Sequence, residues 1–173
     1  FRLGRRSWEL LTAYVAGAVT DREAVVNAVR QAEEQSGPVD AIVNNAGVML
    51  LGSMSEQNPS QWDTMLDVNV RGLLNGVLAV ASGMVARKHG TIINIGSVAG
   101  HKTFPNHAVY VGTKFAVHGL SENLREELSP SNVRVVTIAP GAVETELLGH
   151  TTEKTAAIFA DPRGAEPIRV KVS

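Results

Sequence analysis

The chain alternates between short apolar runs and longer stretches in which apolar residues recur every three or four positions. Four runs are almost wholly apolar and lead into polar or glycine-containing turns: AYVAGAV (13–19), DAIVNNAG (40–47), TIINIGS (91–97) and VRVVTIAPG (133–141). Short runs without regular polar alternation are typical of strands in a parallel sheet that is covered on both faces. We therefore predict four strands, each ending near the polar residues that close its run.

After the first run, the apolar residues recur at the spacing of a helix. Thr20 and Glu23 have the spacing of a capping box, so we predict that a helix begins at Thr20. Gly37-Pro38 predicts its end. The apolar stripe expected to face inward consists of Ala24, Val25, Ala28, Val29 and Ala32.

Two longer helices are predicted further along. Asn58-Pro59 predicts the start of a helical region that runs toward Lys88 and ends at His89-Gly90. Residues 108–128 form the other helix, with His118 expected on its surface. The side chains of the first region that we expect to be buried are Trp62, Met65, Leu66, Leu73 and Leu74.

The order of these elements predicts the fold class. Strands separated by helices indicate an α/β protein with a doubly wound parallel sheet, and no repeat or low-complexity segment suggests a second domain. We therefore expect residues 1–173 to form a single domain. Ligands bind such sheets at the carboxyl ends of the strands. The polar residues after the predicted strands lie there.

Composition narrows the classes of partner. The 173 residues are 44% hydrophobic and 19% charged with a net charge of −1, which suits a soluble globular domain and argues against nucleic acid or an acidic membrane surface as the main partner. The chain has no cysteine, which excludes disulfides and thiolate metal sites, and its five histidines lack tight metal-binding spacing. No uninterrupted apolar run reaches a membrane span, and no signal-peptide pattern occurs, so we expect a cytoplasmic protein without a metal.

Candidate chemistry lies near the start of the last predicted helix. Tyr110 and Lys114 are four residues apart, which places both side chains on one face of a helix, and Ser97 closes the preceding apolar run. A phenol titrates near pH ~10, and a nearby ammonium favours its ionised form. The alternative is an ordinary surface pair on an amphipathic helix.

Five motifs decide between these interpretations. They are NNAG (44–47), Asn69 within DVNVRG, Ser97 within NIGSVAG, YVGTK (110–114) and PGAVET (140–145). In order and spacing this set resembles the classical short-chain dehydrogenase/reductase family, and the resemblance covers roughly residues 15–148. Members of this family are Rossmann-fold enzymes that oxidise alcohols or reduce carbonyls with NAD or NADP. The resemblance therefore implies a Rossmann-like sheet and an oxidoreductase of this kind.

The resemblance also implies four catalytic residues. Tyr110 would act as general acid in carbonyl reduction and as base in alcohol oxidation. Lys114 would lower the pKa of Tyr110 and hold the nicotinamide ribose. Ser97 would donate a hydrogen bond to the substrate oxygen, and Asn69 would support a water that links Lys114 to solvent.

At the adenosine end of the cofactor, the resemblance assigns Asn44, Ala46 and Gly47 to close approach of the backbone to the ribose. The family usually has an aspartate where this chain has Ala18, which would weaken the adenine contact. The main chain of Val19 remains available for that contact.

At the nicotinamide end, the resemblance assigns Pro140, Gly141 and Val143 to the lining of the ring, with the main chain of Val143 at the carboxamide. Thr145 would contact the carboxamide or the pyrophosphate side. Tyr110 and Lys114 complete the cofactor site.

The chain departs from the family pattern at both ends. The glycine-rich TGxxxGxG loop, which binds the pyrophosphate, and the strand before it do not occur in this sequence, and the part after residue 148 is short. We therefore expect an incomplete Rossmann-like fold with unpaired strand edges, belonging to a longer polypeptide because the chain begins with Phe1. The arginines of GRRS (4–7) favour NADP slightly over NAD.

Two functions remain open at this point. The first is an NAD(P)-dependent oxidoreductase that interconverts a small, partly apolar alcohol and its aldehyde or ketone, homo-oligomeric in its complete form. The alternative is a catalytically inactive remnant of the fold that acts by association through its long helices. Binding of a nicotinamide cofactor favours the first, and association without such binding favours the second.

Overall fold

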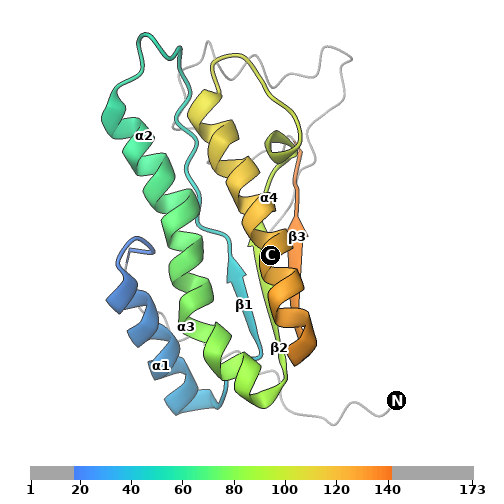
Figure 1. Cartoon of the computed structure of the whole chain (residues 1–173). Helices are drawn as coiled ribbons and strands as arrows, with labels where there is room; N and C mark the ends of the chain where they lie inside the picture. Colours follow the sequence, from blue (N-terminus) through green and yellow to red (C-terminus); the bar gives the residue numbers. More distant parts are fainter. Residues whose placement is uncertain (1–17, 142–173) are drawn as a thin grey trace, which may run out of the picture.

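Residues 18–141 are the part of the chain that the computed structural model describes, and they form parallel strands covered by helices (Figure 1). The predicted helical region after Asn58 and the predicted helix at residues 108–128 are both present. The elements in chain order are α1 (Arg22–Ser36), β1 (Ala41–Asn44), α2 (Pro59–Leu66), the π-helical turn η1 (Asp67–Arg71), α3 (Gly72–Arg87), β2 (Gly90–Ile95), the 3-10 turn η2 (Val98–Gly100), α4 (Ala108–Leu128), the 3-10 turn η3 (Ser129–Ser131) and β3 (Val133–Ile138).

The three strands form one parallel sheet in the order β1-β2-β3. Ile42, Ile92 and Val135 stand in register and point toward α3 and α4, whereas Val43 and Ile138 on the other face are 56% and 47% exposed. Successive strands are added in one direction, so right-handed crossovers place α3 and α4 on the same face, and α1 packs against α3. The described residues are therefore one part of the predicted doubly wound sheet, the part whose helices lie on one face.

The predicted strand at 13–19 meets the described residues only at its end. Ala18 and Val19 are not in a strand; they form a turn in which the Asp21 amide donates to the Ala18 carbonyl at 3.0 Å. Within residues 18–141, β1 pairs with β2 alone, so its other edge has no described partner.

The start of α1 differs from the predicted one by one residue. Asp21, not Thr20, is the N-cap, and its carboxylate accepts a hydrogen bond from the Ala24 amide at 3.1 Å. Aspartate caps a helix at least as well as threonine, which explains the shift. The helix ends at Gly37 (φ 86°), as predicted. The predicted stripe of Ala24, Val25, Ala28, Val29 and Ala32 is half-buried and lies on the side of α1 that packs against α3.

The long helical region is continuous but contains a π-helical turn in its middle. Asn58 caps it, its side chain accepting from the Ser60 amide, and Lys88 ends it in the left-handed conformation (φ 53°). Met65 and Leu73 are buried and Trp62 is half-buried, as expected. Leu66 and Leu74 are 48% and 41% exposed instead, because helical spacing alone cannot tell which of two apolar stripes faces the sheet.

By length and mean hydropathy (1.4), the helical region Pro59–Arg87 would suffice to cross a membrane. Its inward residues Leu73, Val77, Val80 and Met84 pack with Ile92 of β2 in the larger core cluster. A central helix of a packed core passes the same test, so the composition of this region is weak evidence for a span.

Buried asparagines join the sheet to α4. The side-chain nitrogen Nδ2 of Asn44 donates to Asn94 Oδ1 at 2.8 Å, and Asn94 Nδ2 donates to Ser121 Oγ at 2.8 Å. The Ser121 hydroxyl in turn donates to the Val117 carbonyl at 2.6 Å. Gly76 of α3 lies against the Asn44 side chain, since a Cβ at Gly76 would overlap Asn44 Oδ1. Both ends of the Asn94 side-chain amide are hydrogen-bonded, so the network fixes how α4 sits on the strands.

We predict that Asn94→Ala lowers the free energy of unfolding by about 1–3 kcal/mol, since it leaves the Asn44 amide and the Ser121 hydroxyl without their shared partner. Urea unfolding followed by circular dichroism measures this loss. Asn27→Ala is the matched control, because the Asn27 side chain is exposed on α1. Equal effects of the two substitutions would show that the buried network does not stabilise the fold.

Candidate active site

The carboxyl ends of the three strands meet at one edge of the sheet. The turn after β1 contributes Ala46 and Gly47, and the segment after β2 contributes Ser97. The segment after β3 reaches the same place, because the Val98 amide donates to the Pro140 carbonyl at 3.0 Å. Gly141 lies beside Val98. The predicted residues Val143 and Thr145 lie outside the described residues.

Tyr110 and Lys114 lie in the first turns of α4 and face this edge. Both side chains are buried, with 5% and 7% of their surface exposed. The Lys114 ammonium lies 5.8 Å from the centre of the Tyr110 ring and donates a hydrogen bond to the Ile95 carbonyl at 3.0 Å. The interpretation as an ordinary surface pair is therefore wrong.

The pKa values of this pair are governed by burial. Burial raises the pKa of Tyr110, and a hydrogen bond with the Ser97 side chain opposes that rise. Burial also lowers the pKa of Lys114 to about 8. The expected shift of the Tyr110 pKa toward neutrality is thus not seen here, because the loss of solvation outweighs the favourable interactions of the phenolate.

Ser97 is held at the start of the 3-10 turn η2. Its Oγ accepts a hydrogen bond from the Ala99 amide at 3.1 Å, as an N-cap does. Since this bond uses a lone pair of the hydroxyl, its single proton is available to an acceptor. The Ser97 side chain also makes a hydrogen bond with the Tyr110 side chain, so the two hydroxyl groups lie next to each other.

Asn69 lies in the π-helical turn η1 and is 3% exposed. Its amide clamps the segment after β1: the Val48 amide donates to Oδ1 at 2.8 Å, and Nδ2 donates to the Val48 carbonyl at 2.9 Å. Nδ2 also donates to Thr113 Oγ1 at 3.0 Å. These contacts engage both ends of the amide, so its direct role is to hold the turn against α4.

Gly47 lies where Asn69 and Lys114 meet. A Cβ built on Gly47 would be 3.5 Å from Asn69 Oδ1 and 3.8 Å from Lys114 Nζ. The absence of a side chain thus keeps open the space in front of the ammonium. Thr113, which the sequence did not single out, joins the π-helical turn to α4 by accepting from Asn69 Nδ2 at 3.0 Å. Its hydroxyl donates to the Tyr110 carbonyl within α4 at 2.7 Å.

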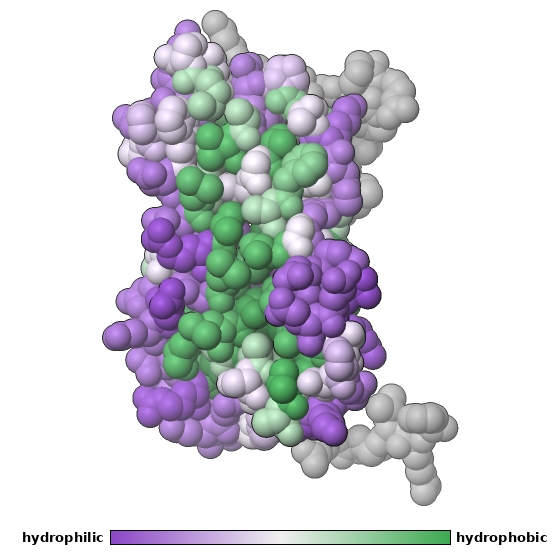
Figure 2. Space-filling view, in the orientation of Figure 1, coloured by the Kyte–Doolittle hydropathy of each residue, from purple (hydrophilic) through white to green (hydrophobic). Residues whose placement is uncertain are grey.

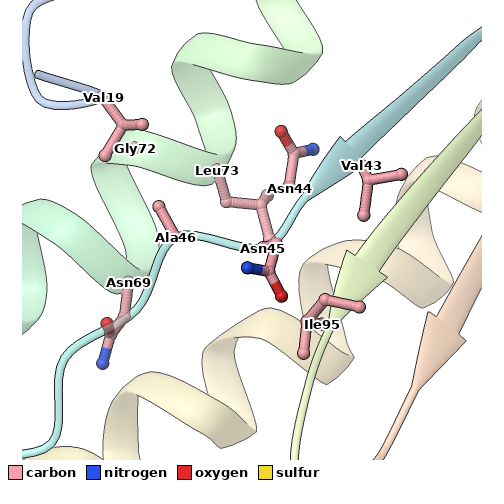
Figure 3. Close-up of a pocket in the computed structure, with 9 residues that line it drawn as sticks. All are labelled: Val19, Val43, Asn44, Asn45, Ala46, Asn69, Gly72, Leu73 and Ile95. Carbon is pink, nitrogen blue, oxygen red and sulfur yellow. The ribbon is translucent and has the colours of Figure 1, made fainter. Parts of the chain in front are cut away.

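A pocket lies next to this group (Figure 3). Its walls come from the end of β1, from the π-helical turn and the start of α3, and from single residues of two other segments: residues 43–46, Asn69, Gly72, Leu73, Val19 and Ile95. Three of the residues predicted to bind the cofactor, Val19, Asn44 and Ala46, therefore lie in one cavity.

The pocket also shows what sequence analysis missed. The carbonyl of Val19 accepts a hydrogen bond from Asn75 Nδ2 at 2.9 Å, so α3 holds the segment that carries Val19. The side chain of Asn44, one of the lining residues, donates a hydrogen bond to Asn94. Asn75 and Asn94 were recognisable as polar residues within apolar stretches.

Histidine and acidic residues do not gather into a metal site in the described part of the chain. No group of three or more such side chains lies close enough together between residues 18 and 141 to hold a metal ion.

Comparison with known proteins places this arrangement in a family context. A family model described as short chain dehydrogenase matches residues 5–156. An uncharacterized oxidoreductase of Listeria monocytogenes is 46% identical over 138 residues, which are 79% of this chain and 56% of the relative. The chain thus spans little more than half the length of the curated relatives it matches, and a similar oxidoreductase of Staphylococcus saprophyticus is also covered over 56% of its length.

Solved structures share the fold. The gluconate 5-dehydrogenase of Burkholderia cenocepacia, solved with NADP and tartrate, has a TM-score of 0.74 and 35% identity over 76% of this chain and 52% of its own. A xylitol dehydrogenase with bound NAD⁺ has a TM-score of 0.72 and 33% identity over 76% of this chain and 51% of its own. The described residues therefore form part of a Rossmann-like α/β fold, as predicted.

Proposed function

The chain belongs to the short-chain dehydrogenase family, and we propose that the whole protein is an NAD(P)-dependent oxidoreductase that interconverts a small alcohol and its aldehyde or ketone. The observation that carries this proposal is the convergence of Ser97, Tyr110 and Lys114 at the carboxyl edge of the sheet, beside a pocket. Residues 1–173 would contribute one dinucleotide-binding and catalytic domain. The names of the oxidoreductase relatives favour this function over the inactive remnant.

Tyr110 is the proposed acid and base. In carbonyl reduction its phenol gives a proton to the substrate oxygen, and in alcohol oxidation its phenolate takes that proton back. The Ser97 hydroxyl, whose oxygen already accepts from the Ala99 amide, donates a hydrogen bond to the substrate oxygen and stabilises the charge that develops there. The buried Lys114 ammonium favours the phenolate when Tyr110 releases its proton.

The described residues fit a nicotinamide dinucleotide. Ala46 contributes only a methyl group to the pocket at the end of β1, and Gly47, which has no side chain, lies near Lys114 Nζ. Both features suit close approach of a ribose. Val19, Asn44, Ala46 and Gly47 would hold the adenosine end. When bound, the cofactor supplies or accepts the hydride.

The other end of the cofactor would lie against the segment after β3. Tyr110, Lys114, Pro140 and Gly141 would hold the nicotinamide end, together with Val143 and Thr145 beyond the described residues. Asn69 would contribute by holding the turn after β1 and, through it, the path of a water between Lys114 and solvent. NADP in one solved relative and NAD⁺ in another leave both cofactors as candidates for this protein, and the arginines of residues 4–7 weight the choice slightly toward NADP.

We propose a small, partly apolar substrate and a homo-oligomer in the cytoplasm. Val98, 41% exposed, follows Ser97 directly, and Phe104 packs on the cluster that contains Tyr110, so apolar surface adjoins the proposed reacting groups. Figure 2 shows a green apolar band along the face that carries the helices. The exposed apolar side chains of this face that support association are Leu66, Leu74, Leu78, Val85 and Phe115.

The proposal is tested on the whole protein with both cofactors. Isothermal titration with NADH and NADPH is expected to show saturable binding of at least one, and absorbance at the nicotinamide band is expected to fall when small aldehydes or ketones are added. Sedimentation velocity of the same sample reports the oligomer. Association without binding or turnover of either cofactor would contradict the proposed activity and favour the inactive remnant.

A further inference from the structure

His118 is not the surface residue that its sequence position suggested. It lies one turn after Lys114 on α4, and its ring enters the space between Gly96 and Gly100, on either side of Ser97. A Cβ on Gly96 would overlap Nε2 of the ring, and a Cβ on Gly100 would overlap its Cδ2. The Ser97 segment therefore has two glycines at the positions where the imidazole touches it.

The ring also makes polar and aromatic contacts with this segment. The Ser97 amide donates a hydrogen bond to His118 Nε2 at 3.4 Å. The ring of His101, which follows η2 directly, stands edge-on to that of His118, with centroids 4.2 Å apart and planes at 82°. The imidazole thus holds the backbone of Ser97 while the Ala99 amide holds its hydroxyl.

We propose that His118 is a positioning residue whose neutral imidazole holds the backbone of Ser97, and whose protonation releases it. Only the neutral tautomer with its proton on Nδ1 offers a lone pair at Nε2. Protonation would turn Nε2 into a donor that faces the donor of Ser97, so the bond would be lost. The consequence for catalysis rests on the proposed function, but the release of the segment does not.

The charges around His118 favour the neutral form. His101 faces it from the end of η2, and Lys114 lies on its own helix; both disfavour a second positive charge. Lys102 is directed toward the Phe104 ring, and Glu122, one turn further along α4, is paired with Arg125. From the sheet, Thr137 packs near Gly96 and is uncharged.

These surroundings set the direction of the titration. Burial lowers the pKa of His118, and electrostatic repulsion from His101 and Lys114 lowers it further. The pKa therefore lies below the usual 6.5 of histidine. The His118 ring is therefore neutral at neutral pH, and its hydrogen bond to the Ser97 amide is expected to break only at acidic pH.

Nuclear magnetic resonance on the full 173-residue chain tests this without an activity assay. The amide of Ser97 and the ring of His118 are expected to titrate together, with one midpoint below pH 6.5. In His118→Gln, whose amide oxygen can accept the same bond, the Ser97 amide should no longer titrate there. In His118→Leu, which fills the space without an acceptor, its hydrogen exchange at neutral pH should be about five- to tenfold faster.

Three results would overturn the proposal. They are a Ser97 amide that does not follow the titration of His118, one that still titrates in His118→Gln, and unchanged exchange in His118→Leu. The pH titration of the unsubstituted chain decides the matter even where a variant fails to fold. In the whole protein, His118→Gln should remove an acid limb from the pH profile of kcat and keep the KM for cofactor. Absence of turnover would count against the proposed function and leave the resonance result standing.

Discussion

Replacement of Tyr110 by phenylalanine in the whole protein is expected to lower kcat by about 10²–10⁴-fold, the range that proton transfer by a positioned side chain contributes. The substitution removes one hydroxyl and keeps the ring that packs in the cluster with Met49, Met65 and Val111. The affinity for NADH or NADPH should change little, because the Lys114 ammonium and the pocket at the end of β1 remain. Steady-state kinetics and isothermal titration measure the two quantities separately.

The position of Tyr110 makes this separation possible. Its side chain is 5% exposed and meets the Ser97 hydroxyl, so the lost group has a defined neighbour and no easy substitute from solvent. Thr103→Val is the matched control, since it removes an exposed hydroxyl from the segment between η2 and α4 and should leave kcat unchanged. Retention of more than about a tenth of the activity in Tyr110→Phe would show that another group transfers the proton.

The pH profile of the unsubstituted protein belongs to the same test. Burial raises the pKa of Tyr110 in this chain, so the phenolate needed as a base in alcohol oxidation forms at alkaline pH unless bound cofactor adds a favourable charge. Carbonyl reduction uses the protonated phenol and should tolerate neutral pH. The oxidative reaction is therefore expected to have the higher pH optimum of the two directions.

Local sequence rules predicted the elements well where the signals were strong. The helix expected at residues 108–128 has those bounds in the structure, and Asn58-Pro59 and Gly37 begin and end their helices as predicted. Each of these signals acts through the backbone of its own segment: a capping side chain, a fixed φ, or a positive φ that glycine accepts. Asp21 replaced Thr20 as the cap because both neighbours can fill the role.

Properties that depend on contacts between distant segments were harder to predict. The exposure of Leu66 and Leu74 follows from which of two apolar stripes of the helical region faces the sheet, and helical spacing alone does not decide that. The link from Asn75 to Val19 spans 56 positions in the sequence, and no local pattern marks its ends as partners. The placement of α3 and α4 on one face of the described strands follows from strand order, which the runs of apolar residues do not encode.

The site shows the same division. Ser97, Tyr110 and Lys114 were found by motif and spacing, and the structure brings them together. The direction of the Tyr110 pKa shift was not predicted, because it depends on how much solvent the fold removes. His118 was misplaced for a related reason: its half-buried position exists because Gly96 and Gly100, far from it in sequence, leave room for the ring.

Replacement of Lys114 by methionine is expected to weaken the function and strengthen the fold. In the whole protein, turnover and cofactor affinity should both fall, because the substitution removes a charge 5.8 Å from the centre of the Tyr110 ring and the ammonium proposed to hold the ribose. A hydrogen bond to a charged group contributes about 1.5–3 kcal/mol, so the dissociation constant should rise roughly ten- to a hundredfold. The pH optimum should move upward, since the phenolate loses its cation.

The gain in stability follows from the pKa of Lys114. It is lowered from 10.5 to about 8 by burial, so between these values the unfolded chain binds more protons than the folded one, and the stability of the fold rises with pH across that window. Below about pH 8, the folded state contains the buried, charged Lys114 ammonium, whose lost solvation destabilises the fold. Methionine carries no charge and has no such penalty. We expect Lys114→Met to raise the free energy of unfolding near pH 7 by about 1–3 kcal/mol, after allowance for the lost bond to the Ile95 carbonyl.

Urea unfolding of the chain between roughly pH 7 and 9.5 measures this effect, below the range where Tyr110, with its raised pKa, adds the opposite slope. The unsubstituted chain should gain stability across that range, and Lys114→Met should lose this gain. Lys102→Met, at an exposed lysine beside the Phe104 ring, is the matched control and should keep it. Wild-type cofactor affinity in Lys114→Met would show that another group holds the ribose, and an unchanged pH slope would show that Lys114 is solvated in the folded chain. If the buried charge of Lys114 serves cofactor binding at the expense of stability, Lys114→Met will be more stable than the unsubstituted chain and will bind the cofactor less tightly.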